Sequence, residues 1–318
     1  MAAAPLAIGI DIGGTKIAAG VVDGEGNVLA RSLAQTPSQS PAEVEDAIAA
    51  VVEELSRRHR AAAVGIGAAG FVDITGSDVL FAPHLAWRNE PLRAAVSRRV
   101  GLPVRVDNDA NAAAWAESKF GAGQGEDHLL CITLGTGIGG GLILGGQIYR
   151  GRYGLAGEFG HQQVVPGGHP CMCGNRGCWE EYASGNVLAR EAQALAAGDR
   201  EAAHEMLSRA QGDITRISGQ VVTDAAAAGD QAAIGLLADV GHWLGVGMAN
   251  LAAALDPGMF VVGGGVSDAG DLLLDPARES FRQTLTGRGF RTEARIERAR
   301  LGAEAGLVGA ADLARTYG

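Results

Sequence analysis

One histidine and three cysteines lie close together in a stretch of the sequence that is rich in glycine and proline. They are His161, Cys171, Cys173 and Cys178. Three thiolates and one imidazole form a common tetrahedral zinc set, and four protein ligands leave no coordination position open, which is typical of a structural zinc. A loop of this composition cannot bury enough apolar surface to hold its shape, so a metal can replace a core. The spacing therefore predicts a structural Zn²⁺ site.

The same cysteines could instead form a disulfide or remain free thiols. Cys171 and Cys173 are too close in sequence to pair easily, and an odd thiol would be left over. His169 competes with His161 as the fourth ligand, but it lies beside a proline in a loop and we interpret it as a solvated histidine. The fourth cysteine, Cys131, lies in an apolar run and is expected to pack as a small hydrophobic residue.

Two carboxylates flank the predicted metal site. Glu158 lies three residues before His161, and Glu180 lies two residues after Cys178. We therefore expect the zinc to hold these two acidic side chains on a shared site.

A second candidate site lies near the N-terminus of the chain. Residues 6–12 read as a buried strand, residues 17–22 as the returning strand of a hairpin, and the turn between them is Gly13, Gly14, Thr15 and Lys16. Walker A and Rossmann loops open a helix, so this turn differs from both. Exposed backbone N–H groups, a hydroxyl and an ammonium can meet phosphate oxygens, and Asp11 before the turn can hold a magnesium–water cluster.

Residues 129–144 repeat this pattern, with Thr133 at the place of Asp11 and Gly135 at the place of Gly13. We interpret the repeat as an internal duplication. Two such hairpins that face each other would grip a polyphosphate from both sides. A merely buried Gly-rich hairpin accounts poorly for so many Gly and Thr residues.

A third Gly-rich turn, Gly263, Gly264 and Gly265, follows an apolar strand over residues 259–262. Such a turn lets a purine lie close to the backbone. It can equally be a close-packed turn between a strand and a helix, and the sequence leaves both possibilities open.

A polar cluster over residues 107–111 follows a strand at residues 104–106 and leads into an Ala-rich helix. Open α/β sheets place their ligands at the carboxyl ends of strands. A helix cap would need only one such polar residue, whereas this segment has four in five positions. We therefore expect a functional site here, with Gly70, which follows the buried strand at residues 63–68, lining it.

The elements between these motifs read as a scaffold. A capping box at Ser40-Pro41-Ala42-Glu43 predicts a helix with an apolar face from Val44 to Leu55. Apolar residues at helical spacing predict a second, long helix from Ile234 to Leu251. A last helix over residues 301–317 is expected to return to the first domain. Residues 198–217 carry little information.

Composition limits the class of protein. The chain has 318 residues, enough for two domains, and 26 basic against 36 acidic residues give a net charge of −10, which disfavours nucleic acid as a partner. The N-terminus lacks the basic region of a signal peptide, and we expect no stretch to span a bilayer. A thiol-based metal site suggests a reducing compartment, so we expect a cytoplasmic protein.

Five segments together resemble the ROK family (repressor, open reading frame, kinase), and within it the zinc-containing, ATP-dependent glucokinases of actinobacteria. The resemblance covers nearly the whole chain. It rests on residues 11–16, 107–111, 134–141, 157–161 and 171–180.

This resemblance implies an actin-like ATPase fold of the α/β class, with two ribonuclease-H-like domains and a cleft between them. We place residues 1–120 and 300–318 in a small N-terminal domain, and residues 121–299 in a larger C-terminal domain that carries the zinc loop.

The resemblance also implies an ATP:hexose 6-phosphotransferase, a glucokinase that makes glucose 6-phosphate. Asp109 would be the general base, and Asp11 would serve Mg²⁺. The sugar site would include Gly70, His84, Asn108, Asp109, Glu158, His161 and Glu180. The ATP phosphates would meet Gly13, Gly14, Thr15, Lys16, Gly135, Thr136, Gly137 and Gly139, and the adenosine would meet Gly263, Gly264 and Gly265.

The family commonly has Asn at the position of His84, and that Asn approaches the sugar. An imidazole is larger and can titrate, so it could alter hexose choice or KM, but we favour the interpretation that His84 still donates one hydrogen bond. Alternative substrates are N-acetylglucosamine or N-acetylmannosamine, and polyphosphate is an alternative donor. A sugar-sensing repressor is a third hypothesis; because the phosphate motif begins by Ile8, we expect no room for its helix-turn-helix. Family members tend to form dimers or tetramers, so we expect a homo-oligomer.

Overall fold

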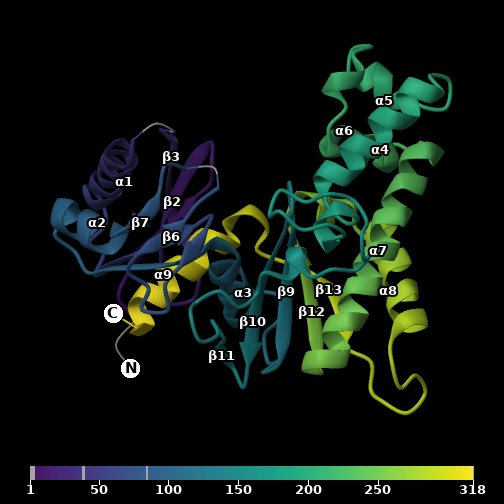
Figure 1. The fold of residues 1–318 in the computed structure, drawn as a ribbon. Coiled ribbons are helices and arrows are strands. Elements are labelled where there is room, and N and C mark those ends of the chain that lie inside the picture. The colour runs from purple at the N-terminus through teal and green to yellow at the C-terminus, as the bar shows by residue number, and fades with distance from the viewer. Residues whose placement is uncertain (1–3, 38–39, 84, 318) are drawn as a thin grey trace. The chain divides into compact units, whose positions relative to one another are not determined.

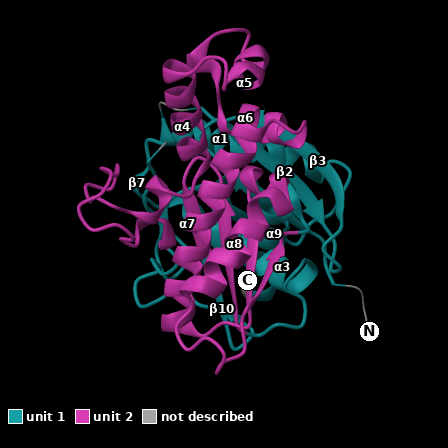
Figure 2. Ribbon diagram, turned by 90° about the vertical axis from the view of Figure 1, so that its right-hand side faces the viewer, with its two compact units in different colours: residues 1–127, 141–157, 300–318 teal, residues 128–140, 158–299 magenta. Residues whose placement is uncertain are grey.

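The computed structural model describes residues 4–37, 40–83 and 85–317, so His84 lies outside the described residues. The chain divides into two compact units, which Figure 2 shows in teal and magenta. Unit 1 comprises residues 1–127, 141–157 and 300–318, and unit 2 comprises residues 128–140 and 158–299. The domain boundaries expected from the sequence stay a prediction.

Unit 1 is built on a five-stranded sheet with the order β3-β2-β1-β4-β8, of which Figure 1 labels β2 and β3. Strands β1 and β2 form an antiparallel hairpin, and β4 lies parallel to both β1 and β8. The register aligns Asp11, Gly67 and Asp107 across neighbouring strands. The strands are β1 Ala7–Ile12, β2 Lys16–Val22, β3 Val28–Gln35, β4 Ala63–Ala68 and β8 Val104–Asn108. A small separate sheet contains β5 Phe71–Val72, β6 Val79–Phe81 and β7 Arg88–Glu90.

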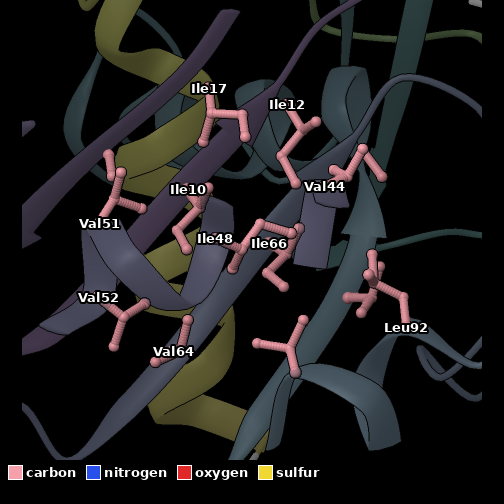
Figure 3. Close-up of a cluster of buried hydrophobic side chains, with 14 of the residues drawn as sticks. Ile10, Ile12, Ile17, Val44, Ile48, Val51, Val52, Val64, Ile66 and Leu92 are labelled. Atoms are coloured by element: carbon pink, nitrogen blue, oxygen red, sulfur yellow. The ribbon is translucent and has the colours of Figure 1, made fainter. Parts of the chain in front are cut away.

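One face of this sheet is covered by α1 (Pro41–Ser56) and α2 (Leu92–Val100). Successive side chains of a strand point to opposite faces. Figure 3 shows Ile10 and Ile12 of β1 in a buried cluster with Val44 and Ile48 of α1. The predicted capping box is wrong in one detail, because the side chain of Ser40 makes no capping hydrogen bond. Pro41 at the first helical position already presets the helical φ without a side-chain cap.

The other face is covered by α3 (Asp109–Phe120) and α9 (Ala305–Tyr317). Glycine allows α9 to touch the strands backbone to backbone. A Cβ on Gly9 of β1 would overlap the carbonyl oxygen of Leu307, and a Cβ on Gly65 of β4 would overlap that of Ala310. The last helix therefore completes unit 1, although the chain reaches it only after unit 2.

Glu117 of α3 is a buried carboxylate with main-chain partners. It accepts hydrogen bonds from the backbone N–H groups of Ala122 (2.8 Å), Arg300 (3.0 Å) and Leu301 (2.8 Å). A buried acid needs such donors to offset its lost hydration. Glu117 thereby holds the end of α3 and the segment that leads into α9 together.

A second five-stranded sheet has the order β11-β10-β9-β12-β13. Its strands follow the same order as β3-β2-β1-β4-β8, as the internal duplication predicts. Strand β12 lies parallel to β9 and β13. The strands are β9 Leu129–Leu134, β10 Ile138–Leu144, β11 Gln147–Ile148, β12 Met259–Gly263 and β13 Arg295–Arg298. Cys131 is buried in β9, as expected.

The helices of unit 2 include the stretch around residues 198–217, which the sequence left undefined and which forms α5 and a short 3-10 turn. In chain order the helices are α4 Gly185–Gly198, α5 His204–Arg209, α6 Gly219–Ala227, α7 Gln231–Leu255 and α8 Asp271–Thr284. Ser184 caps α4, because its hydroxyl accepts from the N–H of Val187.

Helix α7 is long and apolar enough, by length and composition alone, to cross a membrane. This differs from the expectation that no stretch would be. Half of its most apolar 18-residue segment is buried inside the structure. Gly241 and Gly245 let the backbone of α8 approach closely. Core helices of globular proteins have the same composition, so packing accounts for the apolar character of α7.

Candidate active site and metal centre

The four predicted metal ligands come together. The ligand atoms of His161, Cys171, Cys173 and Cys178 all lie within 4.8 Å of one another. Nδ1 of His161 lies 3.6 Å from Sγ of Cys171, and the sulfurs of Cys173 and Cys178 are 3.7 Å apart. A zinc tetrahedron with Zn–S of about 2.3 Å and Zn–N of about 2.05 Å has edges of about 3.6 and about 3.8 Å. A disulfide needs about 2.05 Å, and Cys171, Cys173 and Cys178 form none. The donor set therefore fits zinc.

Tight turns of the backbone create this cluster. The N–H of Cys171 donates to the carbonyl of Asn175 (2.9 Å), and the N–H of Gly174 donates back to the carbonyl of Cys171 (3.0 Å). Gly177 has a φ of +80°, and a Cβ there would overlap the carbonyl oxygen of Val165. Burial raises the pKa of the Cys171 thiol, so its ionised form depends on the charge of a cation.

The competing ligand His169 lies outside the cluster. Its side chain is exposed, its ring centroid lies 5.2 Å from that of Tyr182, and its backbone N–H donates to the Tyr182 hydroxyl at 2.9 Å. The structure thus groups His161, and not His169, with the three cysteines, and the role of His161 as a zinc ligand stays a prediction.

Glu180 lies beside both the metal cluster and the second Gly-rich turn. Its Oε1 is 3.1 Å from Sγ of Cys171 and 3.3 Å from Nδ1 of His161. A Cβ on Gly137 would come within 2.5 Å of its Oε2. Glycine at position 137 therefore leaves room for this carboxylate next to the predicted phosphate turn.

Glu158 immediately precedes the 3-10 turn Phe159–His161. Partial desolvation raises its pKa, His161 opposes this effect, and the charge of Glu180 adds to it. The side chain is still exposed, so solvent screens much of this influence. Glu158, His161 and Glu180 thus form one group of polar side chains around the metal cluster.

The second and third Gly-rich turns adjoin each other and the start of α4. The carbonyl of Gly135 accepts from the N–H of Gly185 at 2.8 Å. Gly264 has a φ of +83°, and a Cβ there would overlap the carbonyl of Leu134, so close packing requires this glycine. Gly265 has open space where a Cβ would stand, which leaves its backbone accessible to a ligand.

In unit 1, Asp11 lies near the carboxyl end of β1, and its Oδ2 would be 2.7 Å from a Cβ on Gly306 in the first turn of α9. Burial raises the pKa of Asp11 to about 6, against the opposing charge of Lys16. The turn that follows is closed by a hydrogen bond of 3.0 Å from the N–H of Gly13 to the carbonyl of Lys16. Thr15 and Lys16 are exposed.

Asp109 opens α3, and Asn108 is the helix cap. Oδ1 of Asn108 accepts from the N–H of Asn111 at 3.0 Å. Its Nδ2 donates to Oδ1 of Asp109 (3.0 Å) and to the carbonyl of Gly70 (3.1 Å). The capping role that the sequence suggested is therefore real, and the same residue also brings Gly70 and Asp109 together.

One member of the polar cluster has a partner that sequence reasoning missed. Asp107 is buried, and its Oδ2 lies 2.6 Å from Nη2 and 2.9 Å from Nε of Arg150. The partners are 43 residues apart, and no periodicity or motif around Arg150 indicated a role.

The described candidate residues thus form one set in each unit. The set in unit 1 is Asp11, Gly13, Gly14, Thr15, Lys16, Gly70, Asn108 and Asp109. The set in unit 2 is Gly135, Thr136, Gly137, Gly139, Glu158, His161, Cys171, Cys173, Cys178, Glu180, Gly263, Gly264 and Gly265.

Two sheets of one strand order, each with a hairpin that carries a Gly/Thr turn, define an actin-like ATPase fold, here with a Cys3His cluster that could hold a metal. The pattern of the ROK family matches residues 7–317, and the chain belongs to this family.

Curated relatives and solved structures extend over almost the whole chain. The glucokinase of Streptomyces coelicolor is 52% identical over 310 residues, which cover 98% of both chains. The crystal structure of a ROK family glucokinase from Streptomyces griseus, in complex with glucose and AMPPNP, superposes with a TM-score of 0.91 at 54% identity and covers 98% of this chain and 99% of that one. The xylose repressor of Bacillus subtilis is 27% identical and aligns over 85% of this chain and 67% of its own length.

Proposed function

We propose that the protein is an ATP-dependent glucokinase, which transfers the γ-phosphoryl group of Mg-ATP to the 6-hydroxyl of glucose. The observation that carries this proposal is the full-length similarity to a ROK glucokinase with bound glucose and an ATP analogue, combined with the presence of an intact Asp109 at the start of α3. Sequence identity above 50% over nearly the whole chain supports a shared activity.

In this proposal Asp109 is the general base. Phosphoryl transfer needs a positioned acceptor hydroxyl and neutralised phosphate charge more than covalent chemistry. A carboxylate close to the 6-hydroxyl accepts its proton as the phosphoryl group arrives. The Oδ1 atom of Asp109 is held by Nδ2 of Asn108 and by the N–H of Ala110, so the carboxylate is oriented before the sugar binds.

The sugar hydroxyls would be bound by Asn108, Glu158, His161 and Glu180. Carboxylates accept from vicinal hydroxyls, and the cluster in unit 2 places Glu180 beside His161. A structural zinc would be held by His161, Cys171, Cys173 and Cys178, where it supplies fixed geometry rather than reactivity. The remaining nitrogen of His161, Nε2, is then available to a sugar hydroxyl.

The phosphates of Mg-ATP would be bound by the turns at residues 13–16 and 135–139, and the adenosine by Gly263, Gly264 and Gly265. Asp11 would hold the hydrated Mg²⁺. The open side of Gly265 and the exposed Thr15, Lys16 and Thr136 support these assignments.

We further propose that the enzyme is cytoplasmic, acts as a homo-oligomer, and has neither nucleic acid nor a membrane as a partner. Two domains, residues 1–120 with 300–318 and residues 121–299, would close on the substrates and exclude water, which competes with the sugar as acceptor. A net charge of −10 supports the absence of a nucleic-acid partner.

The alternative substrate is N-acetylglucosamine or N-acetylmannosamine. The assay that separates the hypotheses is Mg-ATP-dependent ADP release with glucose, mannose, fructose and both N-acetylated sugars. A kcat/KM for glucose far above the others is expected. Preference for an N-acetylated sugar would move the assignment to that class. Sugar binding without turnover would favour a sensor, unless polyphosphate in place of ATP restores the reaction.

A further inference from the structure

A buried ion pair underlies the start of α3. The side chains of Arg150 and Asp107 are only 13% and 5% exposed, and Nε and Nη2 of Arg150 both contact Oδ2 of Asp107. Replacing such a pair by apolar residues is often neutral or stabilising, so its presence is weak evidence of a stabilising role. The geometry that the pair imposes is the more informative feature.

The other oxygen of Asp107 holds the first turn of the helix. Oδ1 accepts from the N–H of Asn108 at 3.0 Å and from Nδ2 of Asn111 at 3.2 Å. Asn108 in turn donates to Asp109 at 3.0 Å and caps the helix through the N–H of Asn111. A continuous series of hydrogen bonds therefore leads from Arg150 to the carboxylate of Asp109.

Arg150 itself is carried by a closed loop. The N–H of Tyr149 donates to the carbonyl of Leu142 in β10 at 2.9 Å, and the N–H of Ala156 donates to the carbonyl of Arg150 at 3.1 Å. A Cβ on Gly154 would overlap the carbonyl of Val72, so this loop also lies directly against β5. The main chain that carries Arg150 is therefore held on both sides of this residue.

We propose that Arg150 is a positioning residue for the reaction: through Asp107 it sets the orientation of Asp109 and of the first turn of α3. This inference rests on the proposed role of Asp109 as general base. It predicts an effect on the chemical step and not on nucleotide binding, because the hydrogen-bond series leads from Arg150 to the carboxylate of Asp109. A misplaced catalytic group costs on the order of 100-fold in rate for a shift of about 1 Å.

The test replaces Arg150 by alanine. In Arg150→Ala we expect kcat to fall by about 10- to 100-fold with an unchanged KM for Mg-ATP. Arg152→Ala is the matched control, since Arg152 is an exposed arginine two residues away and should behave as the wild type. Millimolar guanidinium, well below denaturing concentrations, should restore kcat in Arg150→Ala but not in the double variant Asp107→Asn/Arg150→Ala, which lacks the carboxylate that binds it. Ammonium at the same concentration should restore less, because it lacks the planar fork.

Hydrogen exchange of the Ala110 and Asn111 amides, measured without substrate, separates this inference from the proposed function. Faster exchange in Arg150→Ala, slowed again by guanidinium, supports positioning even if the wild type phosphorylates no sugar. An active wild type with unchanged kcat and exchange in Arg150→Ala would overturn the inference and leave the proposed function standing. If Arg150→Ala does not fold, Arg150→Lys takes its place; folded Arg150→Lys with full kcat and wild-type exchange would equally overturn it.

Discussion

The indole Nε1 of Trp179 donates a hydrogen bond of 2.7 Å to the main-chain carbonyl of Trp243 in α7. Trp179 is fully buried and lies in the sequence between the predicted metal ligand Cys178 and the carboxylate of Glu180. This one side chain therefore attaches the loop of residues 171–178, which carries the three clustered cysteines, to α7, the longest helix of unit 2.

Gly247→Ala should loosen this attachment. A Cβ at position 247 would overlap the indole of Trp179, so the ring must move and the backbone on both sides of it moves as well. We expect a loss of about 1–3 kcal/mol in the free energy of unfolding and faster zinc release to a chelator. Thermal denaturation and a colorimetric zinc assay measure the two effects.

Gly235→Ala is the matched control in the same helix. A Cβ there meets nothing within 4 Å, and alanine favours the helix by roughly 0.5–1 kcal/mol over glycine. The two substitutions should therefore shift stability in opposite directions. Equal stability and equal zinc retention in both variants would show that Trp179 does not anchor the loop.

Cys173→Ser should remove the metal and, with it, sugar binding. Serine is a poor zinc ligand, and without the cation the cluster cannot hold His161 beside Glu180. We expect the zinc content to fall well below one per chain and the KM for glucose to rise at least about tenfold. Met172→Ala is the control, because Met172 lies between two ligands yet is 99% exposed. Full sugar affinity in demonstrably zinc-free protein would contradict this prediction.

Asp11→Asn should stabilise the free enzyme while impairing turnover. Burial raises the pKa of Asp11 from 3.8 to about 6, so the folded state prefers the protonated form. The contribution of Asp11 to stability is therefore fully present below about pH 4 and is lost as the pH rises through 6. Above that pH the neutral Asn variant should be more stable than the wild type by roughly 3 kcal/mol, whereas Mg-ATP turnover should fall.

Urea unfolding at pH 4 and at pH 7.5 measures this difference. Asp23→Asn is a control in which the pKa shift of the aspartate has the opposite sign. Slight burial raises the pKa of Asp23, but hydrogen bonds from Asn27 and Glu25 outweigh it and lower this pKa overall. That variant should lose stability at neutral pH. An Asp11→Asn variant that is less stable than the wild type at pH 7.5 would refute the linkage.

Asp109→Asn should abolish proton acceptance and leave the fold intact. The amide keeps the shape of the carboxylate, but it is not a base. We expect kcat to fall by about 10³-fold, with glucose still bound in calorimetry and an unchanged melting temperature. The exposed Asp239 of α7 provides Asp239→Asn as a control with full activity. Substantial turnover by Asp109→Asn would remove Asp109 from the role of base.

The sequence predicted those parts of the fold that depend on local patterns. Buried strands such as Ala63–Ala68 and the hairpin turn at Gly13 have signals within a few residues, and the candidate metal ligands lie within 18 positions of one another. The duplication of the Gly-rich hairpin could be predicted because both copies have the same short pattern in the sequence.

The interactions that the sequence could not predict join distant segments. Arg150 meets Asp107 across 43 residues, Trp179 meets Trp243 across 64, and Glu117 meets Arg300 across 183. The local sequence does not distinguish these residues: Arg150 is an arginine in a loop, Trp179 is an aromatic residue beside a candidate ligand, and Glu117 is an acid on an Ala-rich helix. Only the tertiary fold selects among the many possible partners.

The backbone contacts of α9 with Gly9 and Gly65 have a consequence for biosynthesis. The strands of unit 1 and helix α3 are synthesised first, but α9, which shares the cover of one sheet face with α3, is synthesised only after unit 2. The part of this apolar face that α9 covers, around Ala7 and Val22, therefore stays open while unit 2 is made. Chaperone demand and aggregation during translation should then depend on when α9 becomes available to cover the sheet.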